Sequence, residues 1–188
     1  MRVHWRCGAT APSKDALLQL TGPGYVPEQF TVHVQLYHTR PSADPTGRVA
    51  DFRTVRDSRL PDSLFIVLPD QVVECGSGTS NHVLLADEKL TPRLAMYFQG
   101  QTYRIGDFLV SIGSCKIGSS DSVEVIVSIS YPACAVTSGR KPVLEIFQEL
   151  GLAGTPLQPA PYKAHGLDIV DSARHQALEY AYMLIGLV

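Results

Sequence analysis

Alternation of apolar and polar side chains dominates the middle of this chain. Within residues 103–136, apolar residues recur at every second position in two runs, 108–112 and 123–129. A period of two places side chains of one parity on one face of a β-strand. Glycine and serine residues at 113–114 and 118–121 favour turns between the runs. The stretch therefore predicts a β-meander of consecutive antiparallel strands.

Strand patterns also occur outside the meander. Apolar and polar residues alternate across 30–37, and 64–68 is an uninterrupted apolar run typical of a strand covered on both faces. Residues 1–7 and 82–86 are the remaining strand predictions, the second after a glycine- and serine-rich hairpin loop at 76–80. With the two runs of the meander and a short strand near 49–55, the chain carries at least seven strand signals.

Four segments have helical composition or spacing. Residues 13–20 predict a helix with Ser13 as its N-cap. Residues 142–150 predict another, with a proline in the first turn and a glycine after the end. Leucine and aromatic residues recur at helical spacing across 87–99, which predicts a helix between strands. Residues 168–187 form a C-terminal helical pattern whose last six residues, 183–188, carry no charge.

Two segments lack either period. Residues 40–61 mix proline, serine, aspartate and arginine, which predicts a mobile loop with a short strand near 49–55. Residues 155–161 contain three prolines and predict an extended strap. Together the elements predict a single α+β domain over residues 1–188: an antiparallel, β-barrel-like sheet with flanking helices, including the C-terminal helix.

Composition narrows the function classes. The chain has 188 residues, 45% of them hydrophobic, so it can bury a sizeable core. Its 18 acidic and 16 basic residues give a formal charge of −2, so no net field attracts nucleic acid or anionic lipid. We expect no direct nucleic-acid partner and no membrane association. Four cysteines far apart, without a Cys-x-x-Cys pair, indicate a reducing compartment, cytosolic or nuclear.

No segment carries a convincing catalytic or metal-binding pattern. Residues 113–120 have the glycine spacing of a phosphate-binding loop, but Ser119 stands where the lysine is required. His4 and Cys7 form one His-x-x-Cys pair without a second half. A Cys–His nucleophile stays open, since its members need not be neighbours in sequence. We therefore expect no catalytic residues, no cofactor and no metal.

The meander resembles the family of Mediator complex subunit 20, also called the TRF-proximal protein. The motif is carried by residues 103–113 and 122–134. The resemblance continues, in the order that the family shows, at Tyr37-His38-Thr39, Leu84-Leu85-Ala86-Asp87, Leu144-Glu145-Ile146-Phe147 and residues 177–182. It covers most of the chain, and agrees only loosely at 40–61 and 76–80.

The resemblance implies a nuclear, non-catalytic domain of the Mediator head module. The family pairs with Mediator subunit 18, and that pair is tethered through the C-terminal part of subunit 8. Other head-module subunits and the RNA polymerase II machinery are the wider partners that it implies. Mediator bridges gene-specific activators to that polymerase.

The lack of a chemical site and the apolar chain end lead to the hypothesis of a scaffold subunit. Apolar strand residues on the parity facing away from the barrel interior, together with the apolar end, are then the candidates for burial by a partner. These interface candidates are Leu109, Ile126, Tyr182, Met183, Leu184, Ile185, Leu187 and Val188.

Two alternatives stay open. A tunnel-type phosphohydrolase needs an acidic cluster inside the barrel that holds a divalent metal. A small-ligand carrier needs an internal cavity of about 300–1,000 Å³.

Overall fold

One sheet organises the chain. The computed structural model describes residues 2–7, 14–22, 24–39, 51–76, 90–120, 123–132, 140–167 and 172–187. Within them, nine antiparallel strands form a single sheet in the order β5-β4-β3-β2-β6-β7-β8-β1-β9. The strands are β1 (Arg2–Arg6), β2 (Glu28–Thr39), β3 (Asp51–Asp57), β4 (Ser63–Val67), β5 (Val72–Gly76), β6 (Leu90–Ile105), β7 (Phe108–Ile117), β8 (Val123–Ser130) and β9 (Thr155–Pro156).

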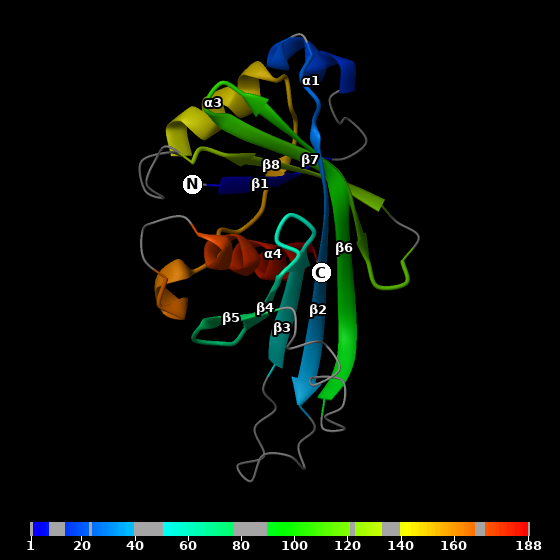
Figure 1. Cartoon of the computed structure of the whole chain (residues 1–188), viewed down its shortest axis with the longest axis vertical. Helices are drawn as coiled ribbons and strands as arrows, with labels where there is room; N and C mark the ends of the chain where they lie inside the picture. The colour runs from blue at the N-terminus through cyan, green and yellow to red at the C-terminus, as the bar shows by residue number, and fades with distance from the viewer. Residues whose placement is uncertain are drawn as a thin grey trace.

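Helices flank this sheet, which confirms the predicted α+β class. The described helices are α1 (Lys14–Thr21), α3 (Arg140–Glu149), the 3-10 helix η2 (Tyr162–His165) and α4 (Ala173–Leu187). β5 and β9 are the two edges of the sheet and do not pair with each other in the described part of the chain, so the barrel is open. Figure 1 shows the sheet curling around α4, with α1 and α3 on the opposite side.

The face of the sheet that meets α4, here called the inner face, carries the main core. Seven strands, β2 to β8, contribute buried residues to it, and α4 contacts β2, β3, β4 and β5. Because the contacting side chains are apolar on both sides, their burial holds helix and sheet together. The buried members are Phe30, Val32, Val34, Val55, Phe65, Val67, Val72, Met96, Phe98, Cys115, Ile126, Ala160, Ala177, Leu178, Tyr180, Ala181, Met183 and Leu184.

A smaller core lies on the opposite, outer face under α3. The ring of Trp5 stacks on that of Phe147 with centroids 4.2 Å apart. Val110, Val127 and Ile129 complete the contact from the meander. Ile126 of β8 belongs to the inner core, whereas Val127 and Ile129 belong to the outer core, so β8 is buried on both faces.

The meander is confirmed, with one change in its turns. β6, β7 and β8 pair consecutively in antiparallel register. The turns lie at Gly106 and Gly118, which have φ values of 58° and 56°. Gly113, predicted as a turn residue, lies inside β7 instead, opposite Gly100 of β6.

The helix predicted over residues 87–99 is wrong from Leu90 onward, because that stretch is the first part of β6. Met96 and Phe98 are buried while Tyr97 between them is exposed, which is the period of a strand. β6 pairs with β2 along one side and β7 along the other, and this pairing overrides the helical spacing of the leucines. Pro92 is accommodated next to a register shift in the β2–β6 ladder.

Other expectations differ in their boundaries. The predicted loop over 40–61 contains β3 from Asp51, somewhat later than the expected strand near 49–55, and residues 40–50 lie outside the described residues. The strap over 155–161 contributes the two-residue strand β9 to the sheet edge. Helix α4 is described from Ala173 rather than 168. The predicted strand at 82–86 and the N-cap at Ser13 also lie outside the described residues.

Two glycines allow β6 and β7 to approach closely. Gly100 and Gly113 are register partners. A Cβ atom on Gly100 would lie 2.0 Å from the carbonyl oxygen of Ile112, and one on Gly113 would lie 2.3 Å from that of Gln99. Both obstacles are backbone atoms, which side-chain motion cannot relieve. Glycine is therefore required for the curl of the sheet at this row.

We expect Gly113→Ala to lower the free energy of unfolding by about 1–3 kcal/mol, because the added methyl forces two paired backbones apart. Gly76→Ala on β5 is the matched control, since no atom lies within 4 Å of its added Cβ. Urea unfolding followed by circular dichroism measures both variants. Equal stability of the two variants would contradict the close-approach argument.

Candidate interaction site

Three of the predicted interface residues are buried inside this chain. Ile126 is 0% exposed, and Met183 and Leu184 are each 2% exposed, all within the core between the sheet and α4. The register also places Leu109 and Ile126 on the inner face, whereas the sequence-based hypothesis placed them on the parity facing away from the interior. The apolar character of these positions is therefore explained, at least for the three buried ones, by packing within the chain.

The other candidates keep some surface. Ile185 is 46% exposed, and Tyr182 and Leu187 are partly exposed at the end of α4. Leu109 lines a cavity of about 350 Å³ at the inner face, beside Arg2 and Arg59. Val188 lies outside the described residues. A role of these residues in binding a partner stays a prediction.

A buried ion pair fixes α4 to β1. The guanidinium of Arg2 donates a hydrogen bond to Oε2 of Glu179 at 3.2 Å, and both side chains are buried. The hydroxyl of Tyr162 donates to the other carboxylate oxygen, and the ring of His4 lies 3.7 Å from Oε2. Burial opposes the charged carboxylate, but Arg2, His4 and Tyr162 outweigh it, so the pKa of Glu179 is lowered.

A second polar anchor ties α4 to the turn after β3. Arg59 donates to both carboxylate oxygens of Asp57, at 2.8 and 2.5 Å, and to the hydroxyl of Tyr180 at 2.7 Å. Its guanidinium also lies 4.7 Å from the centre of the Phe30 ring. Although burial opposes the cation, these oxygen partners raise the pKa of Arg59 above its usual value. Both arginines near the inner cavity thus have carboxylate partners of their own.

The described residues bring together no group of three or more His, Cys, Asp or Glu side chains that could hold a metal ion. His4 contacts the inner-face ion pair, while Cys7 is buried in the outer core, so the two do not converge on one site. Burial raises the pKa of both the Cys7 and the Cys115 thiols, the latter to about 12. These two cysteines pack as small apolar residues. Among the described residues, no helix has the length and apolar character needed to cross a membrane.

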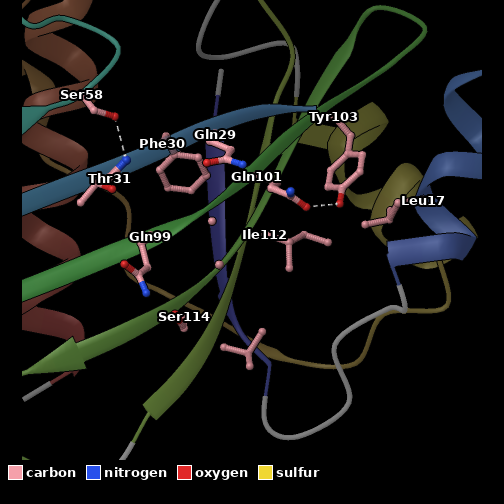
Figure 2. Close-up of a pocket in the computed structure, with 13 residues that line it drawn as sticks. Leu17, Gln29, Phe30, Thr31, Ser58, Gln99, Gln101, Tyr103, Ile112 and Ser114 are labelled. Atoms are coloured by element: carbon pink, nitrogen blue, oxygen red, sulfur yellow. Dashed lines mark hydrogen bonds between the residues drawn. The ribbon is translucent and has the colours of Figure 1, made fainter. Parts of the chain in front are cut away.

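An open groove of about 680 Å³ lies on the outer face. Figure 2 shows it between α1, which contributes Leu17, and the strands β2, β6 and β7. None of its lining side chains is charged. They are Leu17, Gln29, Phe30, Thr31, Ser58, Gln99, Gln101, Tyr103, Ile112, Ser114 and Val125, with the backbone of Gly100 and Gly113.

Two hydrogen bonds connect residues that line the groove. The hydroxyl of Tyr103 donates to the side-chain oxygen of Gln101 at 2.8 Å, and the backbone N–H of Thr31 donates to the Ser58 hydroxyl at 2.8 Å (Figure 2). The side chain of Gln99 is exposed. The groove thus offers amide and hydroxyl groups above an apolar floor. Sequence patterns missed it, because its residues come from four strands that only the register brings together.

The fold and these surfaces define a class of protein: an open antiparallel sheet curled around its own C-terminal helix. A family model described as TATA-binding related factor (TRF) of subunit 20 of Mediator complex matches residues 15–184 of this chain. The chain belongs to this Mediator subunit 20 family. The resemblance noted in the meander is therefore confirmed.

Solved structures show looser similarity. A chain of the Schizosaccharomyces pombe Mediator head module aligns at 9% identity with a TM-score of 0.49, covering 83% of this chain and 98% of that one. A putative adenylate cyclase from Bacillus halodurans aligns at 8% identity with a TM-score of 0.48, covering 84% of this chain and 92% of that one. The PH1819 protein of Pyrococcus horikoshii aligns at 11% identity with a TM-score of 0.44, covering 82% of this chain and 92% of that one. No curated protein sequence matches the chain.

The buried ion pair predicts a loss of stability in acid. Because the pKa of Glu179 is lower in the folded chain than its ordinary value of 4.5, its contribution is complete above that value. The contribution is lost as pH falls through the folded pKa. We expect Glu179→Gln to lower the free energy of unfolding by about 3–5 kcal/mol at pH 7, since Arg2 is left buried without its counter-charge.

Urea unfolding at pH 7 and at pH 3 measures this difference. The gap between the wild type and Glu179→Gln is expected to narrow at pH 3. A gap of unchanged size would show that the carboxylate charge of Glu179 does not stabilise the fold. Glu145→Gln is the control, because this exposed residue of α3 forms an i,i+4 pair with Lys141 at 3.8 Å.

Proposed function

We propose that this chain is a non-catalytic scaffold subunit of the Mediator head module. It acts in the nucleus, pairs with Mediator subunit 18 and contributes to the regulation of RNA polymerase II transcription. The C-terminal segment of subunit 8 reaches it indirectly, through subunit 18. The observation that carries this proposal is the family match over residues 15–184.

The interior of the sheet supports a role without catalysis. A tunnel-type phosphohydrolase would need this space for an acidic cluster and metal. Here the inner face is filled by α4 and apolar side chains such as Phe98 and Leu178. Two carboxylates that are buried at this face, Asp57 and Glu179, are each held by an arginine of the same chain.

A small-ligand carrier fits the cavities less well than a scaffold does. The groove of about 680 Å³ is open to solvent on the outer face. The inner cavity near Leu109 is about 350 Å³ and has polar walls that include Glu28, Thr102 and Ser111. Ligand carriers enclose a mostly apolar ligand inside the fold, and neither cavity provides that environment.

Pairing with subunit 18 should use the exposed end of α4. We expect a 1:1 complex of the two purified subunits in size-exclusion chromatography with light scattering. Ile185→Asp should weaken that complex at least about tenfold, the cost of removing a well-packed apolar contact and burying a charge. Val26→Asp is the matched control, because Val26 is an apolar surface residue, 83% exposed, before β2.

Two results separate the parts of this proposal. If the wild-type chain forms no complex with subunit 18 at micromolar concentration, the pairing itself is refuted. If the complex forms and Ile185→Asp leaves it unchanged, pairing stands and its location on α4 is wrong.

A further inference from the structure

A row of five side chains crosses the outer face beside the groove. Strand register places Arg56 of β3 opposite His33 of β2, and His33 opposite Tyr97 of β6. Tyr97 is in turn opposite Lys116 of β7, and Lys116 is opposite Val123 of β8. Side chains opposite each other in neighbouring strands lie on the same face. The row therefore places one cation on each side of an aromatic pair, Arg56 beside His33 and Lys116 beside Tyr97.

The aromatic pair is both ordered and accessible. The rings of His33 and Tyr97 stack with centroids 4.5 Å apart at an angle of 15°. Tyr97 is 48% exposed, and Val123 at the end of the row is 58% exposed. Burial and the nearby Arg56 cation lower the pKa of His33, so its ring stays neutral and acts as a support for Tyr97. The row thus combines apolar surface with positive charge.

The acidic residues of the strands lie on one face of the sheet. In the described strands, the acidic residues all lie on the inner-face parity of the register: Glu28, Asp51, Asp57, Glu74 and Glu124. On the outer face, Arg56 and Lys116 therefore have no carboxylate in the same rows of the sheet. These two strand positions are therefore basic although the whole chain is slightly acidic.

We propose that this row and the adjoining groove bind an extended acidic protein segment. Neighbouring strands are about 4.8 Å apart, so Arg56 and Lys116 are separated by about 14 Å. An extended peptide rises about 3.4 Å per residue, so acidic residues at positions i and i+4 match the two cations. The residue at i+2 then lies midway between the two cations, over the stacked rings of His33 and Tyr97. The expected motif is acidic, any, apolar, any, acidic.

The groove supports the same occupant. An extended backbone has unpaired N–H and C=O groups, and the uncharged amide and hydroxyl side chains of Gln99, Thr31 and Ser114 are suitable partners for them. Gln99 lies next to the row, two residues along β6 from Tyr97. A nucleic acid fits less well, because its affinity depends on neutralising many phosphates and the row supplies two cations. This inference does not depend on pairing with subunit 18.

Fluorescence anisotropy of the full chain with labelled peptides tests the proposal. The probe contains Asp-Ser-Leu-Ser-Asp flanked by glycine and serine, and a second probe replaces both Asp residues with Asn. We expect the acidic probe to bind at least about tenfold more tightly. A third probe with adjacent Asp residues should lose most of that advantage. Equal binding of the acidic and Asn probes, or no binding of either, would overturn the proposal.

Variants locate the site. Arg56→Gln combined with Lys116→Gln should weaken acidic-probe binding at least about tenfold, while Lys141→Gln combined with Lys163→Gln, on exposed helix positions, should leave it unchanged. Because Arg56 is partly buried, Lys116→Glu alone provides a variant on an exposed side chain. Should neither Lys116 variant weaken binding, the site is misplaced. A labelled twelve-nucleotide RNA that binds more tightly than the acidic probe, and depends on Lys116, would overturn the protein segment in favour of nucleic acid.

Discussion

Burial of α4 against the inner face of the sheet is the contact on which the rest of this structure depends. The sheet does not close on itself, so its inner face would be exposed without the helix. An open sheet with one bare apolar face would be a target for aggregation. By filling the interior with Leu178, Tyr180 and Met183, the chain completes its core from its own sequence.

Two buried carboxylates in this interior, Asp57 and Glu179, are paired with arginines. Glu179 and Arg59 are charged residues at the boundary between α4 and the sheet, and each is held by an opposite charge and a tyrosine hydroxyl. Such pairs fix the direction and register of the helix, because any slip along the sheet leaves a charge buried and unpaired. Because α4 packs against the inner face of the sheet, the outer face and the chain ends remain for binding. This arrangement suits a scaffold subunit.

Local sequence patterns predicted much of this fold but not its pairing. Alternation at residues 123–129 was sufficient to predict a strand, although both faces of β8 are buried from Ile126 onward. The leucines of β6 recur at helical spacing, and pairing with β2 and β7 determines that this segment is a strand. Ile126 was expected on an outward surface, because a strand pattern gives two parities without saying which one the helix covers. The row from Arg56 to Lys116 could not be predicted from the sequence, because its residues are far apart in the chain and only the strand register aligns them.

Hydrogen–deuterium exchange of the isolated chain, followed by mass spectrometry, tests the central claim most directly. If α4 is an internal part of the core, the amides of Ala173–Leu187 are protected in the isolated chain to the same extent as those of β6 (Leu90–Ile105), and adding subunit 18 changes α4 only near its exposed end. Rapid exchange throughout α4 in the isolated chain, with protection appearing only when subunit 18 is added, would contradict the account.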